Sequence, residues 1–420
     1  MEGNKNWQMG CPVSTYAKAV AALKHPGFRW LLIGQALSLQ GNWIQNTAQR
    51  WLVLELSNSP FYVGLLGAVS GIPVLLFSFM GGYLSDRFDR FSVLFLAHVL
   101  ILLQGLFLGV MVDIDRITLG LLLITSFFFG TGMAFEVPAR QTLVFDLVGK
   151  KDITNALALH STAFNLARFL GPAVAGFLMD LKMLSLCFYL KAVSALLVIW
   201  ALFIILKRGY ATNKKAVKQQ VGLKEGIKFA SRHPLIRPVL TIILVFGITL
   251  LPYSILLPSL GRDVLGLGAR EYGLLCSSNG LGALAGAIFV AFLGNTDNRT
   301  KWWWIGSTIF PVTLIIVGLA QSFYQASFAL FFSGFFMVIC ATSAISLIQI
   351  HSKDHIRGQM MGLFTTSFMG FFPIGSILVG AVGDLLGVRA TLILQGSTAL
   401  LIVIMIKMRH RLTTLFFSSP

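Results

Sequence analysis

Amide and hydroxyl side chains recur within the apolar segment 28–54. They are spaced three or four residues apart, so they share one face of a helix whose other faces carry leucine, isoleucine and tryptophan. The polar positions are Gln35, Ser38, Asn42, Gln45, Asn46 and Gln49, with Arg50 beside them. If this helix lies in a membrane, the stripe must face water or other helices. The amides could simply hold helices together, but six polar positions exceed what helix pairing needs, so we favour a substrate-binding cavity.

A second charged position falls inside the apolar segment 154–180. At a rise of 1.5 Å per residue, Arg168 lies about 21 Å along a helix that begins at Thr154. Ser161 and Asn165 share its face. An arginine at this depth faces a bundle interior or an aqueous cavity. We expect no acidic residue at comparable depth, so Arg168 either bonds backbone and amide groups or offers its charge to an anionic ligand.

Inside a membrane, a side chain that takes up and releases protons is often Asp, Glu or His. The candidates are Glu136, at the inner end of the apolar segment 117–138, and Glu55, at a helix end. Glu136 could relay protons or simply bond Arg140. We expect His98 and His160 to be structural. Lys191, about 10 Å from a helix end, is expected to extend toward the membrane surface.

The second half of the chain offers hydroxyl and amide groups as further cavity candidates. These are Tyr253, Ser254, Asn279, Ser346 and Gln349. The four cysteines are far apart, and three of them lie in apolar segments where they are expected to pack as inert side chains. The sequence contains no phosphate-binding loop, metal-ligand spacing or nucleophile triad. We therefore expect no enzyme, no bound metal and no cofactor.

The composition indicates which elements hold these residues. Hydrophobic residues make up 56% of the 420 positions and charged residues only 12%, about half the share found in soluble domains. This excludes a soluble enzyme. A membrane-spanning helix needs about 20 apolar residues. Twelve segments qualify: 28–54, 61–83, 91–112, 117–138, 154–180, 184–206, 236–259, 271–293, 302–320, 323–350, 358–383 and 388–408. We therefore predict an all-α membrane protein with twelve transmembrane helices.

The basic residues set the predicted orientation. Of 33 Lys and Arg residues, 25 fall on one set of alternate segments and five on the other, which places both termini in the cytoplasm. Because the net charge of +17 is spread over helix ends, we expect no nucleic-acid partner. The predicted domains are an arm (1–27), a six-helix bundle (28–206), a basic linker (207–235), a second six-helix bundle (236–409) and a tail (410–420). Segments 154–180 and 358–383 share similar flanks, which favours two pseudo-symmetric halves.

The connector after the second segment carries a recognisable motif. It reads Gly82-Tyr83-Leu84-Ser85-Asp86-Arg87-Phe88-Asp89-Arg90. This resembles the Gly-x-x-x-Asp-Arg-x-Gly-Arg signature of the major facilitator superfamily, with Asp89 in place of the second glycine. Further motifs are similar to those of its bacterial exporters related to the enterobactin exporter and macrolide efflux pumps. They are Pro138-Ala139-Arg140-Gln141, Asn155-Ala156, Asn165-Leu166-Ala167-Arg168, Gly171-Pro172 with Gly176, Arg232-His233-Pro234-Leu235 and Arg357-Gly358.

The resemblance implies the major facilitator fold, with two six-helix halves around a central cavity that opens alternately to each side of the membrane, driven by the proton gradient. It implies that Asp86 holds an inner gate shut by pairing with Arg140 and with the helix that begins near Gly358. Gly82, Arg87 and Arg90 belong to the same gate motif. Gly171, Pro172 and Gly176 resemble the helix-bending motif of antiporters and exporters, which favours export.

We therefore predict an inner-membrane, proton-coupled exporter of a small anionic metabolite such as a siderophore. A multidrug or macrolide efflux pump is the second interpretation, although a pump for cations should carry a buried acid. A lysophospholipid or nutrient importer is the third, and a non-transporting scaffold is the fourth. The expected partners are a small-molecule substrate, protons and the lipid bilayer of a bacterial inner membrane, and we expect a monomer.

Overall fold

The computed structural model describes residues 20–87, 89–210, 223–293, 298–353 and 356–417, with the backbone alone for 78–87, 223–225 and 410–417. All regular structure in these ranges is helical. The first part comprises η1 (Ala21–Lys24), α2 (Pro26–Ser57), α3 (Pro60–Arg87), α4 (Arg90–Asp113), α5 (Leu119–Asp180), α6 (Leu184–Lys207) and α7 (Leu223–Arg232). The second comprises α8 (Ile236–Val245), η2 (Phe246–Leu250), η3 (Leu251–Ile255), α9 (Leu257–Ser259), η4 (Leu260–Val264), α10 (Ala269–Leu293), α11 (Arg299–Leu319), α12 (Phe323–His351), α13 (Arg357–Thr365), η5 (Thr366–Gly370), α14 (Phe372–Leu386) and α15 (Val388–Phe417).

The twelve predicted spans correspond to these helices. Ten helical segments among the described residues are long and apolar enough to cross a membrane. The 62-residue α5 contains two predicted spans, which meet at Gly149, where φ is 71°. The remaining predicted span is α2. Its amide side chains lower its hydropathy, so it is not among the ten apolar segments. The prediction of an all-helical membrane protein is therefore confirmed, while the proposed domain boundaries stay predictions.

Two predicted boundaries are wrong. The segment predicted to end at 138 continues through Pro138, and the turn comes only at Gly149. A proline removes one backbone hydrogen bond and bends a helix, but neighbouring helices can support it in a membrane protein. The predicted connector 82–90 is also mostly helical, because α3 runs to Arg87 and α4 begins at Arg90.

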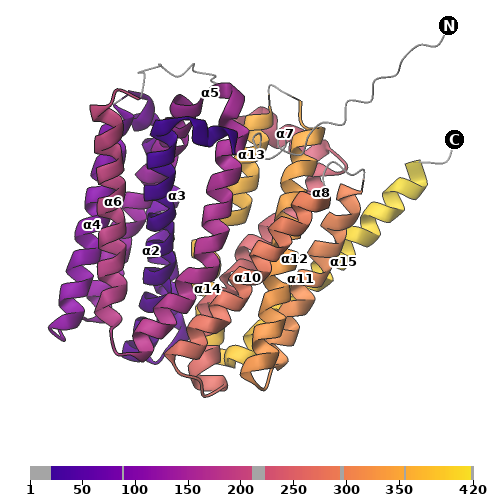
Figure 1. Ribbon diagram of the computed structural model, residues 1–420. Coiled ribbons are helices and arrows are strands. Elements are labelled where there is room, and N and C mark those ends of the chain that lie inside the picture. Colours follow the sequence, from indigo (N-terminus) through magenta and orange to yellow (C-terminus); the bar gives the residue numbers. More distant parts are fainter. Residues whose placement is uncertain (1–19, 88, 211–222, 294–297, 354–355, 418–420) are drawn as a thin grey trace, which may run out of the picture.

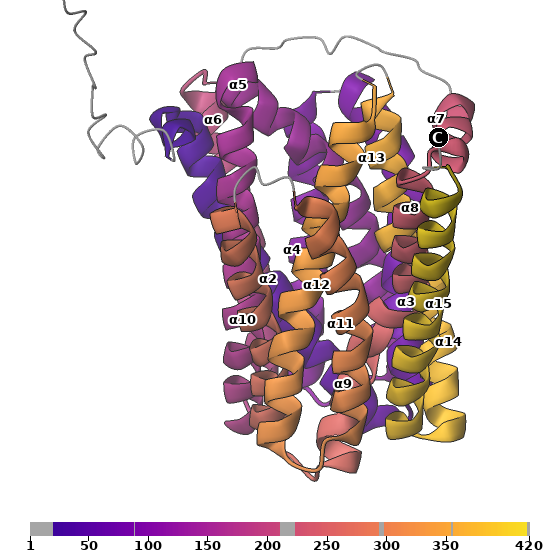
Figure 2. The same cartoon turned by 90° about the vertical axis from the view of Figure 1, so that its right-hand side faces the viewer.

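The long helices run side by side between two ends of the molecule. Figures 1 and 2 place α7 and α13 at the upper end, here called the α7 end, and Figure 2 places α9 at the other, the α9 end. Helix α3 packs against α14, and α5 packs against α10. These helices approach closely near the α9 end. A Cβ atom on Gly273 of α10 would lie 2.6 Å from the Cα atom of Gly176, and one on Gly64 would lie 3.2 Å from the Cα atom of Gly380.

The packing is looser toward the α7 end of α13. Cβ atoms added to Gly358 and Gly362 would meet no other atom within 4 Å. On α5, Leu157 is 49% exposed, and on η5, Met369 is 59% exposed. Helices α5 and α10, and α3 and α14, are therefore in close contact near the α9 end, whereas Leu157 and Met369 are not covered by a neighbouring helix.

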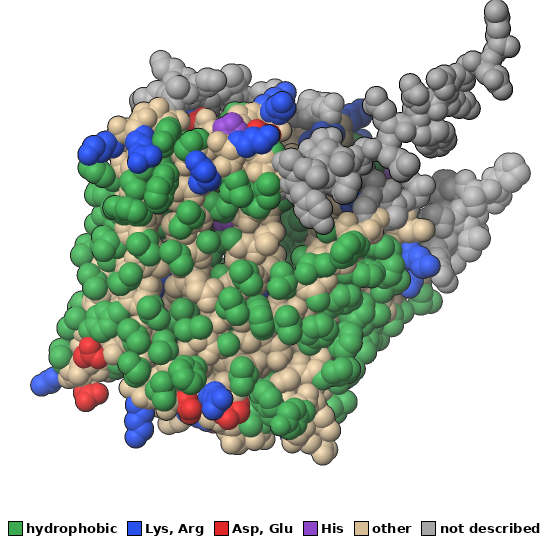
Figure 3. Space-filling view, in the orientation of Figure 1, with side chains coloured by type: hydrophobic (Ala, Val, Ile, Leu, Met, Phe, Trp, Pro, Cys, Tyr) green, Lys and Arg blue, Asp and Glu red, His purple; other side chains and the backbone are tan. Residues whose placement is uncertain are grey.

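The outer surface suits a bilayer. The face shown in Figure 3 has a broad band of hydrophobic and uncharged side chains, while lysine, arginine and acidic side chains gather at its two ends. Many large apolar side chains are open to the surroundings, among them Phe203 at 63% and Leu96 at 65%. Exposed apolar area of this extent marks contact with lipid rather than water.

Candidate functional site

A cavity of about 500 Å³ lies among α2, α4, α5 and α6, with further contributions from α3 and η5. Its apolar wall includes Trp43, Phe129 and Phe164. Its polar and ionisable lining consists of Gln35, Ser38, Asn42, Asn46, His98, Glu136, Arg140, His160, Ser161 and Lys191. The wall also includes the exposed side chains of Leu157 and Met369. The cavity thus combines aromatic surface with an unusual density of buried ionisable groups, as expected of a ligand site.

Glu136 lies inside this cavity and not at a helix end. Only 4% of it is exposed. One of its carboxylate oxygens, Oε1, lies 2.8 Å from Nε of Arg140, one helical turn away. The expectation that the acidic candidates lie only at helix ends is therefore wrong for Glu136. The error follows from the predicted helix end at 138, since α5 continues and carries Glu136 in its interior. The predicted bond to Arg140 is present.

Lys191 also points inward. The residue is completely buried, and its Nζ atom donates a hydrogen bond to Oγ of Ser38 at 3.0 Å. No carboxylate oxygen among the described residues lies within 4 Å of this ammonium group. The expectation that Lys191 extends to the membrane surface is wrong, because its side chain packs against Gly41 of α2, whose missing Cβ leaves the room.

Two histidines complete the group, although they were expected to be structural. His98 is 1% exposed, and its Nδ1 atom lies 3.0 Å from the carbonyl oxygen of Leu94. Nη1 of Arg140 contacts Nε2 of His160, whose other ring nitrogen has no protein partner. The charge of Glu136 acts on His98, Arg140 and Lys191. The available signal was that His98, Glu136 and Lys191 are each the one charged or histidine residue of an apolar segment.

Some of the α2 amides line the cavity and others hold helices together. Gln35, Asn42 and Asn46 line the cavity. Gln45 donates through Nε2 to Oε1 of Gln104 at 3.1 Å. Gln49 donates through Nε2 to Oγ of Ser126 at 3.2 Å. Those last two glutamines therefore bond α2 to α4 and α5, and the three others are available to a ligand.

Arg168 bonds a neighbouring helix. Its Nη2 atom donates to Oδ1 of Asn279 on α10 at 2.6 Å, and its guanidinium carbon lies 5.8 Å from the ring centroid of Trp43. Tyr253 lies beside the same group and is 3% exposed. Of the two open alternatives, the contacts favour bonding to an amide, and Arg168 is not part of the cavity lining. Arg168 therefore joins α5 to α10.

The remaining candidates from the sequence have local partners outside this cavity. Asn165 donates to the carbonyl oxygen of Ser161 on its own helix. Ser254 lies 3.5 Å from the carbonyl oxygen of Leu251, and Ser346 contacts Arg299. Gln349 is exposed, and its Nε2 atom lies 3.9 Å from the sulfur of Met361. Arg50 acts electrostatically on Tyr272, and Glu55 accepts a hydrogen bond from Trp51.

The predicted gate residues are partly described. The side chains of Gly82, Asp86 and Arg87 lie outside the described part of the structure. Arg90 pairs with Asp146 of α5. Gly171 allows α5 to approach α2, since a Cβ atom there would lie 2.5 Å from Cβ of Trp43. Pro172 and Gly176 face Gly273 of α10. The helix-bending motif is therefore a site of close helix contact.

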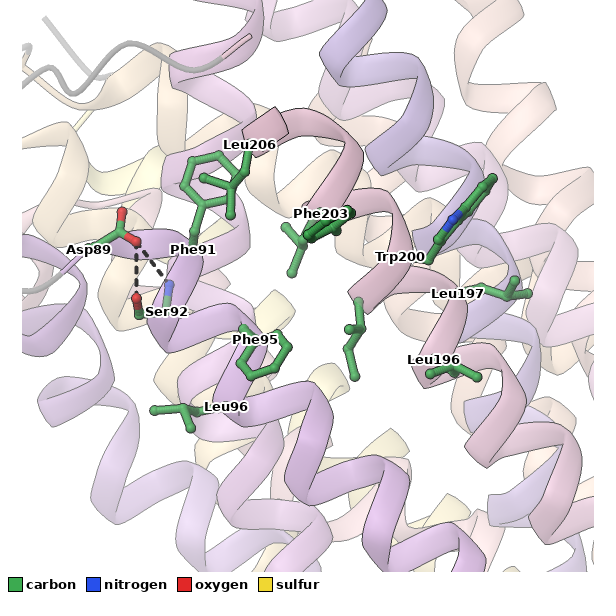
Figure 4. A pocket seen from close by; sticks show the side chains of 12 residues that line it. Asp89, Phe91, Ser92, Phe95, Leu96, Leu196, Leu197, Trp200, Phe203 and Leu206 are labelled. Carbon is green, nitrogen blue, oxygen red and sulfur yellow. Dashed lines mark hydrogen bonds between the residues drawn. The ribbon is translucent and has the colours of Figure 1, made fainter. Parts of the chain in front are cut away.

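A second hollow lies on the outer surface between α4 and α6. It measures about 810 Å³, and Figure 4 shows Phe95, Leu196 and Phe203 around it. The carboxylate of Asp89 at its edge accepts hydrogen bonds from the backbone nitrogen and Oγ of Ser92, and so caps α4. This groove is larger than the cavity but offers an apolar, lipid-facing wall and no buried cation for an anionic ligand.

Comparison with known proteins identifies relatives over nearly the whole chain. A sequence model of the family described as transmembrane secretion effectors matches residues 17–416. The chain is 23% identical over 365 residues to the staphyloferrin A transporter of Staphylococcus aureus, covering 86% of this chain and 91% of that protein. It is 23% identical over 403 residues to macrolide efflux protein A of Streptococcus pyogenes, covering 92% and 97%. It is 23% identical over 376 residues to the enterobactin exporter of Salmonella typhi, covering 86% and 87%.

Solved structures support the same fold. A bacterial homolog of the human lysosomal transporter Spinster, in an inward-facing and unoccupied conformation, superposes with a TM-score of 0.72 at 13% identity, covering 92% of this chain and 97% of that chain. The family resemblance predicted from the sequence motifs is thus confirmed by relatives of both predicted kinds, siderophore exporters and macrolide efflux proteins.

Proposed function

Since the chain belongs to the transmembrane secretion effector family of the major facilitator superfamily, we propose that it exports a small anionic metabolite of the siderophore class. It is a multi-pass membrane transporter and not an enzyme. In our proposal it lies in a bacterial inner membrane with both termini in the cytoplasm, so the α7 end faces the cytoplasm. The cavity then receives its substrate from the cell, and proton movement at Glu136 is linked to transport.

The observation that supports this proposal is the excess of cations and hydrogen-bond donors in the cavity. Two basic side chains, Lys191 and Arg140, stand against the single carboxylate of Glu136 among the described lining residues. Nε2 of Gln35 is buried without a hydrogen-bond acceptor. A buried cation and unpaired donors suit the oxygen atoms of an anionic ligand. Two relatives carry names that state a siderophore, staphyloferrin A and enterobactin.

Efflux of cationic or neutral drugs is the second candidate, because one observation favours it. A pump for cations was expected to need a buried acid, and Glu136 is such an acid. Trp43, Phe129 and Phe164 add aromatic surface to the same cavity. A cation stacked on these rings beside the carboxylate is a recurrent recognition mode. The bond between Glu136 and Arg140 argues against it, since that carboxylate is already paired.

Transport into everted membrane vesicles separates these candidates. Vesicles containing the wild-type protein should accumulate labelled staphyloferrin A, and Lys191→Met should lower the initial rate by about tenfold or more, because the buried cation is lost. Lys207→Met, at an exposed lysine on the same helix, should transport at the wild-type rate. A thermal melting curve for each variant in detergent excludes unfolding as the cause. Accumulation of a cationic dye but not of the siderophore would establish the second candidate instead.

A further inference from the structure

The carboxylate of Glu136 occupies the position beside Arg140 that a substrate carboxylate could take. It contacts Arg140 at 2.8 Å, with 6% of the Glu136 side chain and 11% of the Arg140 side chain exposed. Arg140 also contacts His160 through Nη1. Each of these groups lines the cavity. A ligand entering the cavity therefore meets an arginine that already holds an internal anion.

Lys191 adds a cation without a matched anion. An ammonium group has three donor hydrogens, and the hydrogen bond to Ser38 uses one. Nε2 of Gln35, a residue that is 4% exposed, and Nδ1 of His160 are buried without partners in the same lining. A buried cation and unsatisfied donors of this kind are costly unless a ligand or water completes them. Among the described lining residues, the basic side chains Arg140 and Lys191 thus outnumber the one carboxylate, Glu136.

We propose that a carboxylate of the substrate binds Arg140, Lys191 and Nε2 of Gln35, and that Glu136 is released from Arg140 and takes up a proton. This inference rests on the proposed anion transport. The proton comes from an acid in the bulk solution, hydronium or buffer, whose conjugate base stays in solution. It bonds a carboxylate oxygen of Glu136, and no other covalent bond of the protein changes. Anion and proton then bind together, because an ionised Glu136 without Arg140 would remain as an uncompensated buried charge.

Among the described residues, the ionisable groups around Glu136 are Arg140 and His160 on α5, His98 on α4 and Lys191 on α6. Helix α3 also packs against α5, and its side chains 78–87 lie outside the described part of the structure. On α2 the lining side chains, such as Gln35 and Ser38, are uncharged. Protonation of Glu136 removes a negative charge, and protonation of His98, His160 or Lys191 adds a positive one, while Arg140 stays positive throughout. Proton binding anywhere in this group therefore favours an anionic ligand and opposes a cationic one.

Proton uptake on anion binding determines which force can drive export. A proton that binds with the anion would leave the cell with it. Export of a polycarboxylate is then driven by the membrane potential acting on the remaining negative charges, which a negative cell interior pushes outward. Export of a cationic drug from the same cavity would instead release the proton, which is antiport. The direction of proton movement on binding thus reports the charge of the ligand.

Calorimetric titration of the purified full chain in detergent tests the proposal. Staphyloferrin A is titrated at one pH in two buffers of different ionisation enthalpy, so that the protons exchanged on binding are counted. The wild-type protein should take up about one proton per ligand, and its Kd should rise by up to about tenfold per pH unit once Glu136 is ionised in the free protein. Glu136→Gln should bind the ligand without this uptake and with little pH dependence.

Two controls keep the result interpretable. Asp180→Asn, at an exposed aspartate at the end of α5, should behave as the wild type. Glu136→Asp, which keeps a titrating carboxylate, should retain proton uptake. Proton release by the wild type, or uptake that persists unchanged in Glu136→Gln, would overturn the proposal. If neither the wild type nor any variant binds staphyloferrin A, the proposed siderophore substrate is wrong. If a cationic ligand binds and releases a proton from Glu136, the drug-efflux candidate is supported instead.

Discussion

Replacing Gly273 by alanine should force the α9 end apart. In the described conformation a Cβ atom at position 273 would lie 2.4 Å from the carbonyl oxygen of Pro172 and 2.6 Å from the Cα atom of Gly176. These are backbone atoms, so no side chain can rotate away. Overpacking of this kind costs about 1–3 kcal/mol. Because the cost applies only while α5 and α10 touch, the population of this conformation relative to one open at the α9 end should fall by about 5- to 150-fold.

Labelling of a cysteine placed at Ser161 measures this shift. Ser161 is exposed and lines the cavity. The native Cys187 and Cys340 are buried, and Cys11 and Cys276 are replaced by serine in this experiment. If the Gly273→Ala variant prefers the alternative conformation, the cysteine at position 161 should react more slowly with a maleimide. Gly362→Ala is the matched control, since a Cβ atom there meets nothing within 4 Å. An unchanged labelling rate in a folded Gly273→Ala variant would refute the idea that this glycine contact stabilises the closed α9 end.

Two further predictions concern orientation and stability. In intact cells an impermeant maleimide should label Arg116→Cys but not Arg208→Cys, because the lysine and arginine distribution places residue 208 in the cytoplasm; the opposite pattern would invert the topology. Asp146→Asn should lower the melting temperature in detergent, because removing one partner of a buried ion pair costs about 3–5 kcal/mol, and Asp146 and Arg90 have side chains only 9% and 12% exposed. Asp152→Asn, at the more exposed pair with His25, should cost at most about 1 kcal/mol, and equal melting shifts for both variants would contradict this account.

Local sequence rules were sufficient to predict the helices but not the residues at which the helices end. Each span needs a stretch of apolar residues, and a stretch is visible in the sequence without any knowledge of its neighbours. The end of a helix in a membrane depends on what supports its backbone. At Pro138 the helix continues, and the chain turns instead at Gly149, whose positive φ suits glycine.

The site could be predicted only one side chain at a time. The sequence placed Arg168 and the α2 amides inside the bundle, because polar groups in an apolar helix must face inward. Their partners are distant in the chain: Asn279 lies 111 positions from Arg168, and Ser38 lies 153 positions from Lys191. Helical spacing gives the face of one helix but not which helix packs against it. For the same reason, His98, Glu136 and Lys191 were not recognised as one group.

The cavity and the closed α9 end share a contact at Trp43. Its ring lines the cavity and lies 5.8 Å from the guanidinium carbon of Arg168, which in turn bonds Asn279 of α10. Its Cβ atom also lies where a side chain at Gly171 would sit. A ligand that displaces the Trp43 ring therefore changes the surroundings of the arginine that joins α5 to α10. Occupancy of the cavity and separation at the α9 end thus act on the same side chains, as alternating access requires, because a ligand can shift a conformational equilibrium only through contacts that differ between the two states.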